Sequence, residues 1–280
     1  DFAGAIADQT QAIAINPAYS NAYNDRGMVY YRQNNYTAAL NDYNAAIKND
    51  PAYFLAYKNR ATVQVALKNY TAADNDYTKC IELKPEDADG YLGRGSMKSI
   101  QNNYAEAISF YDKAIQYEPN NAVTFLNRGN AKYALKDTKG ALPDYIKVSQ
   151  LQPNNVNVYF NLGTIYMTQN KSNEAIEAFK KYNSGLPNEW SGYKNTADVY
   201  YSQLKQYDQA EIYYNKAYQI NKSQKDIIER LGYSLLNQKK IPQAIAMFNN
   251  QIALLPNDYW GYYNLGAAYS VGKQPAESLK

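Results

Sequence analysis

Apolar and aromatic residues recur along the chain at spacings of three and four, and the whole pattern returns every 34 residues. Such spacings place side chains on one face of a helix, whereas a strand would alternate at every second residue. Two such stretches, separated by a polar turn, fit into each period. We therefore predict an all-α chain in which tandem helical hairpins stack into an α-α superhelix, or solenoid.

Prolines mark the end of each predicted hairpin, because proline cannot continue a helix and keeps the residue before it extended. Six of them stand 34 residues apart: Pro17, Pro51, Pro85, Pro119, Pro153 and Pro187. Asn221 stands at the next place, and the proline one period further on, Pro256, comes one residue late, which indicates a single insertion in the sixth repeat. The turn sequence SQLKQYDQA is one residue longer than its counterpart in the first repeat, so we expect the insertion near Leu204 to Gln206.

Small residues and aromatic residues alternate at fixed places within the period. Ten residues after each proline the chain has Gly27, Ala61, Gly95, Gly129, Gly163 and Ala197. Sixteen residues after each of the first five come Tyr43, Tyr77, Tyr111, Tyr145 and Phe179. A small residue at a helix crossing lets two helices approach closely, while large side chains fill the space beside it. We expect these aromatic residues in the hairpin core.

This skeleton resembles the tetratricopeptide repeat (TPR) family, whose aromatic, Gly, Ala and Pro positions stand at the same offsets. The resemblance extends along the whole chain and implies a single array over 1–280. In that array 1–19 is the second helix of a truncated repeat, full repeats lie at about 20–53, 54–87, 88–121, 122–155, 156–189, 190–224 and 225–258, and 259–280 is a partial final repeat.

Composition argues against catalysis and metal binding. The sequence has no histidine, which removes the commonest general base and zinc ligand. Its one cysteine, Cys80, stands where the family has a small packing residue, so we interpret it as an inert core residue. No glycine-rich phosphate loop occurs, since the glycines recur at helix crossings. We expect no enzyme activity, no metal and no cofactor.

Charge and hydropathy limit the kinds of partner that the chain can bind. The formal net charge is only +3 and no basic run concentrates it, so we do not expect nucleic acid binding. No apolar stretch approaches the roughly 18 residues of a spanning helix, so we expect no direct membrane insertion. The sequence starts within a repeat and carries no information on targeting. Its composition is similar to that of bacterial arrays, and the location stays open between the cytoplasm and the bacterial cell envelope or periplasm.

The resemblance implies that the first helix of each hairpin lines a concave groove that binds a protein or peptide partner. Two residues before the small residue of that helix stand Asn59, Asn127, Asn161, Asn195 and Asn264. An asparagine amide can both donate to and accept from an extended peptide backbone. A similar row of asparagines, one in each successive repeat, occurs in relatives such as O-GlcNAc transferases and kinesin light chains. The alternative is that these are ordinary solvated residues of an Asn-rich chain.

Tyrosines and cations form a second set of groove candidates. Tyr31, Tyr133 and Tyr201 stand four residues after the small residue, and Lys58, Lys194 and Arg230 also fall on first helices. Tyrosine favours recognition surfaces, although most tyrosines of the chain belong to the hairpin core. The carboxylate clamp of chaperone adaptors does not fit, because Thr62 and Asp198 stand where its asparagines belong. We therefore do not expect a heat-shock-protein terminus as the ligand.

Arginine precedes the small residue in four successive repeats, at Arg26, Arg60, Arg94 and Arg128. Such a ladder could suit an acidic partner. We favour a structural role, in which each arginine packs its stem between repeats and reaches a nearby carboxylate. Leu162, Thr196, Leu231 and Leu265 take the place in later repeats, so the two halves of the chain differ chemically.

These observations favour a scaffold or adaptor that binds an extended segment of a partner. Two alternatives stay open. The first is self-assembly as a homo-oligomer through open repeat ends, where Tyr259, Trp260, Tyr262 and Tyr263 form an aromatic cluster. The second is a role as the regulatory or substrate-recruiting arm of a larger protein.

Overall fold

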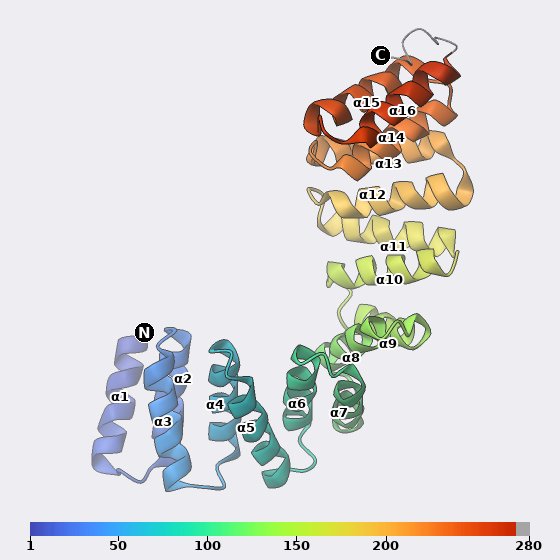
Figure 1. Cartoon of the computed structure of the whole chain (residues 1–280). Coiled ribbons are helices and arrows are strands. Elements are labelled where there is room, and N and C mark those ends of the chain that lie inside the picture. The colour runs from blue at the N-terminus through green and yellow to red at the C-terminus, as the bar shows by residue number, and fades with distance from the viewer. Residues whose placement is uncertain (273–280) are drawn as a thin grey trace. The chain divides into compact units, whose positions relative to one another are not determined.

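The structure, a computed structural model, describes residues 1–272 and consists of helices joined by short turns over that range (Figure 1). The helices are α1 (Phe2–Ile15), α2 (Ser20–Arg32), α3 (Tyr36–Asn49), α4 (Phe54–Ala66), α5 (Tyr70–Leu83), α6 (Ala88–Ile100), α7 (Tyr104–Tyr117), α8 (Ala122–Ala134), α9 (Thr138–Leu151), α10 (Val156–Thr168), α11 (Ser172–Gly185), α12 (Trp190–Asp198), the π-helix η1 (Val199–Leu204), α13 (Tyr207–Ile220), α14 (Lys225–Asn237), α15 (Ile241–Leu254) and α16 (Tyr259–Val271). The prediction of an all-α fold of tandem helical hairpins is confirmed.

The chain divides into two compact units, Asp1–Lys147 and Val148–Lys280. Within the first unit α2 pairs with α3, α4 with α5, and α6 with α7. Within the second, α10 pairs with α11, α12 with α13, and α14 with α15. Each of these hairpins occupies one period of the sequence. The expectation of one continuous array over 1–280 stays a prediction.

Each hairpin turn is closed in the same way. One residue takes a left-handed conformation, with φ of 56° to 62°, at Asn34, Lys68, Asn102, Lys136, Asn170, Lys205 and Lys239. In the first hairpin the N–H of Asn35 then donates to the carbonyl of Tyr30 at 2.9 Å. This bond satisfies a carbonyl that the end of the helix would leave unpaired. The turn therefore fixes how the second helix folds back on the first.

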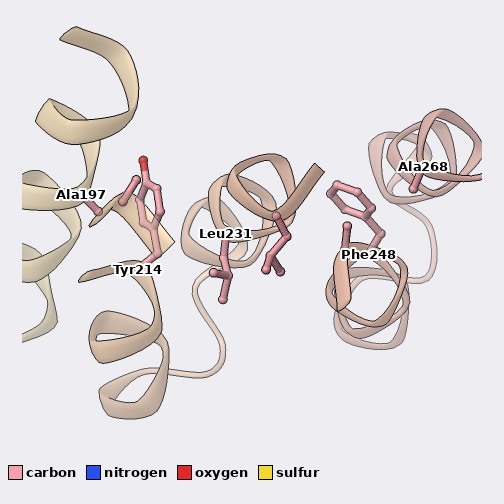
Figure 2. Packing of buried hydrophobic residues seen from close by; sticks show 8 residues of the cluster. Ala197, Tyr214, Leu231, Phe248 and Ala268 are labelled. Carbon is pink, nitrogen blue, oxygen red and sulfur yellow. The ribbon is translucent and has the colours of Figure 1, made fainter. Parts of the chain in front are cut away.

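The hairpin core is built from the predicted contact between a small residue and an aromatic ring. An added Cβ on Gly27 would lie 2.8 Å from Cε1 of Tyr43, and one on Gly163 would lie 2.6 Å from Cε1 of Phe179. Both distances are shorter than carbon atoms tolerate, so the helices can approach this closely only at glycine. Figure 2 shows the corresponding layer of the second unit, where the Tyr214 and Phe248 side chains are fully buried.

The inserted residue of the sixth repeat lies inside a helix and not in the turn after it. Helix α12 continues into the π-helix η1, and Lys205 takes the left-handed position 35 residues after Asn170 instead of 34. The N–H of Gln206 accordingly reaches back six residues, to the carbonyl of Tyr200 at 2.9 Å. The predicted place, in the turn near Leu204 to Gln206, is corrected, because a π-helical turn absorbs one residue without changing the turn.

The arginine ladder has the structural role that we favoured. Arg26 donates to both carboxylate oxygens of Asp42, at 2.8 and 2.7 Å, and Arg60 does the same to Asp76, at 2.9 and 2.6 Å. Arg128 likewise holds Asp144 with two nitrogens. The hydrogen bonds that Arg26 donates to Asp42 raise the pKa of Arg26, as expected for a cation held by a carboxylate.

Two repeats show what replaces this ion pair. In the third, Phe110 stands where the others have aspartate, so Arg94 lies 4.6 Å from the Phe110 ring centre and donates instead to Asp74 at 3.0 Å. In the fifth repeat, which belongs to the second unit, buried Leu162 and Ala178 occupy the two positions. The same place in the hairpin thus accepts either a paired charge or an apolar contact.

We expect Arg26→Leu to lower the free energy of unfolding by about 3–5 kcal/mol, because it leaves the buried Asp42 carboxylate without its partner. The double change Arg26→Leu with Asp42→Ala reproduces the Leu162 and Ala178 pair, and we expect it to recover all but about 1 kcal/mol. Urea unfolding followed by circular dichroism measures both. A double variant as unstable as the single one would contradict this account of the ladder.

Candidate functional site

The predicted groove asparagines all lie on first helices, but they fall into two groups. In the first group the amide already has a partner. Asn59 on α4 donates to the Oδ1 of buried Asn24 at 2.9 Å. Asn264 on α16 is fully buried, accepts a hydrogen bond from the Tyr233 hydroxyl at 2.5 Å and donates to Gln251 at 3.3 Å. The expectation that Asn264 faces an open groove is therefore corrected.

The second group consists of Asn127 on α8, Asn161 on α10 and Asn195 on α12. All three side chains are half-buried, and within residues 1–272 none of their amides makes a hydrogen bond. They occupy the same position in three consecutive repeats, the first in the first unit and the other two in the second. Each therefore keeps a donor and an acceptor available for another molecule.

The predicted groove cations are held by carboxylates. Lys58 forms an ion pair with Asp89 of the next repeat. Lys194 lies 2.9 Å from Asp198 and 2.8 Å from Asp226. Burial opposes the charge on Lys194, but the hydrogen bond to Asp226 and the charge of Asp198 outweigh burial and raise the pKa of Lys194.

Arg230 shares this neighbourhood, 3.8 Å from Asp226 and 5.9 Å from the centre of the Tyr201 ring. Its guanidinium therefore lies near an acid and over an aromatic face. Two carboxylates, Asp198 and Asp226, therefore balance the two cations, Lys194 and Arg230.

The predicted groove tyrosines differ in exposure. Tyr133 is 41% exposed. Tyr31 is half-buried, with its ring 5.9 Å from that of Tyr36. Tyr201 packs edge-on against Tyr207 at 5.3 Å, and its hydroxyl accepts from Asn237 at 3.2 Å. Tyr133 alone of the three therefore presents much of its ring to solvent, and their contact with a ligand stays a prediction.

A groove of about 290 Å³ opens on the first unit between α4, α6 and α8. It is lined by Lys58, Thr62, Val65, Tyr77, Asp89, Leu92, Gly93, Ser96, Met97, Val123 and Asn127. The structure thus brings the predicted residues Lys58 and Asn127 to one site, whereas Asn59 does not line it. Sequence reasoning missed Tyr77 and Gly93, because the repeat pattern places Tyr77 in the hairpin core.

Family models match the chain at five places between residues 20 and 224. A model described as tetratricopeptide repeat matches residues 20–53, a second with the same description matches 56–87, 88–121 and 197–224, and one described as TPR repeat matches 129–170. Together they cover more than half of the chain. The chain belongs to the tetratricopeptide repeat family. Arrays of this family are scaffolds for interactions between proteins.

Solved structures show the same fold. The C-terminal part of a TPR protein from Cytophaga hutchinsonii is 19% identical with a TM-score of 0.72, over 85% of this chain and 98% of that one. PilF from Pseudomonas aeruginosa is 19% identical with a TM-score of 0.64, over 75% and 95%. YrrB, described as a TPR protein with an unusual peptide-binding site, is 22% identical with a TM-score of 0.62, over 66% and 95%. No curated protein sequence matches the chain.

Neither a membrane-spanning helix nor a metal-binding group is found in the part of this TPR chain that the structure describes. No helix there is long and apolar enough to cross a membrane. No group of three or more His, Cys, Asp or Glu residues within 1–272 could hold a metal ion. Cys80 is fully buried, with its sulfur 3.9 Å from the Phe54 carbonyl oxygen, and burial raises the pKa of its thiol to about 12. This supports the interpretation of Cys80 as an inert core residue.

We expect Cys80 to resist thiol reagents as long as the protein is folded. At about pH 8 a thiol with this pKa is ionised to only about one part in ten thousand, and the thiolate is the reactive form. Labelling with an aromatic disulfide reagent should be at least about a hundredfold slower in the native protein than in urea. Equal rates in the two states would show that the thiol is accessible and reactive.

Proposed function

We propose that this protein is a scaffold or adaptor whose first-helix faces hold an extended segment of a partner protein. The observation that carries the proposal is the set of unpaired amides at Asn127, Asn161 and Asn195. A half-buried amide without a partner has lost part of its hydration and gains a full hydrogen bond when a ligand supplies one. An extended peptide offers alternating carbonyl and N–H groups, to which a primary amide can both donate and accept.

Backbone recognition of this kind is tolerant of sequence, because it does not depend on the side chains of the partner. The exposed ring of Tyr133, 41% accessible, adds contact area of the kind that recognition surfaces use. Charge supports a protein partner over nucleic acid, since the arginines at 26, 60, 94 and 128 all bind aspartates of the chain itself. We propose a binding role without catalysis, consistent with a sequence that lacks histidine.

The proposal is tested by replacing the three unpaired amides together, as Asn127→Ala, Asn161→Ala and Asn195→Ala. The probes are peptides selected on the immobilised protein from a display library of short random sequences. We expect the triple variant to bind them at least about tenfold more weakly by fluorescence anisotropy, because each lost hydrogen bond contributes about 1 kcal/mol.

The matched control replaces three exposed asparagines on second helices, Asn41, Asn75 and Asn173, by alanine. This variant has the same change in composition and should bind as the unmodified protein does. Peptide affinity that is unchanged in the first triple variant, or equally reduced in both, would refute backbone recognition by the amides.

Self-assembly is a second candidate, favoured by the aromatic face of α16. Tyr259 is 69% exposed and Tyr263 63%, and the Trp260 ring packs edge-on against Tyr263 at 5.5 Å. An exposed cluster of this kind is typical of an interaction surface. Light scattering over a range of concentrations tests it, and a mass of one chain throughout would exclude it. The role as an arm of a larger protein stays a prediction.

A further inference from the structure

The second hairpin departs from the packing that its neighbours share. In the first, third and fourth hairpins the aromatic ring lies over the glycine of its own hairpin. The atom nearest to an added Cβ is Cε1 of Tyr43 at 2.8 Å for Gly27, Cε1 of Tyr111 at 2.6 Å for Gly95 and Cε1 of Tyr145 at 2.9 Å for Gly129. The second hairpin has Ala61 at the glycine position, and its ring, Tyr77, also reaches the next repeat. Alanine alone does not cause this, because Tyr214 is fully buried beside Ala197 in the sixth hairpin.

The ring of Tyr77 packs against Gly93 of the next repeat. An added Cβ on Gly93 would lie 2.4 Å from Cδ1 of Tyr77, so the ring fills the place that a side chain at position 93 would take. Gly93 stands at the position where other repeats have Asn127, Asn161 and Asn195. Tyr77 is accordingly half-buried, whereas the corresponding tyrosines of the neighbouring hairpins are at most 1% exposed.

Tyr77 and Gly93 both line the groove on the first unit. The Tyr77 ring lies there with the apolar side chains of Val65, Leu92, Met97 and Val123. Thr62, Ser96 and the unpaired amide of Asn127 add polar groups to the same lining. The two charged residues of the lining, Lys58 and Asp89, form an ion pair with each other, so they cancel.

We propose that this groove is a specificity pocket that receives one uncharged, apolar side chain of the partner segment. The inference rests on the proposed function and adds a sequence requirement to it. The volume of about 290 Å³ is at or below the lower limit of the roughly 300–1,000 Å³ typical of small-molecule sites, and it is far larger than the roughly 30 Å³ of one water. A side chain attached to a backbone held by Asn127 fits this size.

The chemistry of the lining selects against charge. A charged side chain would lose hydration on entering an apolar floor and would find only a neutralised ion pair in return. An apolar side chain loses nothing of this kind and gains the burial of its surface against Tyr77 and Val123. The amide of Asn127 remains available to the backbone beside it, whereas the Thr62 and Ser96 hydroxyls donate to the Lys58 and Leu92 carbonyls of their own helices and can only accept.

The test uses the same peptides from a random display library, selected on the full chain. We expect the selected sequences to share an apolar residue at one position, and its replacement by serine to weaken binding at least about tenfold. Val123→Glu, at a residue 49% exposed in the first turn of α8, places a charge in the pocket without disturbing the core and should cause a comparable loss. Leu55→Glu is the matched control, because Leu55 is 45% exposed and stands at the same position of the second repeat, outside the pocket. This variant should bind the peptides as the unmodified protein does.

The outcomes separate this inference from the proposed function. One outcome would overturn the pocket and leave backbone recognition intact. In it, the peptides bind more weakly after Asn127→Ala, but neither replacement of their apolar residue nor Val123→Glu changes the affinity. Equal losses from Val123→Glu and Leu55→Glu would also overturn it. If no selected peptide depends on Asn127, the proposed function fails, and the pocket inference fails with it.

Discussion

The close contact between a small residue and an aromatic ring is the interaction on which each hairpin depends. Where the small residue is glycine, the ring lies so near that even a methyl group would collide with it, as at Gly163 and Phe179. This contact sets the spacing of the two helices and therefore the direction in which first-helix side chains point. Where the contact is altered, at Ala61 and Tyr77, the surface of the neighbouring repeat changes as well.

Much of this structure follows from the sequence, because the period fixes the packing positions. The prolines and small residues predicted the hairpins, and the arginine ladder was correctly assigned to internal ion pairs. The π-helix at Val199–Leu204 could not be placed, since an extra residue shifts the downstream register equally whether it lies in the helix or in the turn. The burial of Asn264 was also hidden, because it depends on Gln251, which replaces a small residue on the facing helix.

The candidate site was predicted only in part, because the repeat position of a residue does not reveal its partners. Asn59 and Asn127 share a position, yet the first is bound to Asn24 and the second is unpaired. Ion pairs within the chain satisfy the groove cations Lys58 and Lys194. The three amides that stay unpaired at the predicted position, Asn127, Asn161 and Asn195, are neutral and polar, and they match the hydrogen-bonding groups of a peptide backbone.

The most direct test of the central claim is nuclear magnetic resonance of the side-chain amides in protein labelled with 15N at asparagine only, with a selected peptide added. The account predicts that the NH₂ signals of Asn127, Asn161 and Asn195 shift on binding, while that of Asn264, which is fully buried and already hydrogen-bonded, does not. Shifts confined to asparagines of the second helices, such as Asn75 and Asn173, would contradict it.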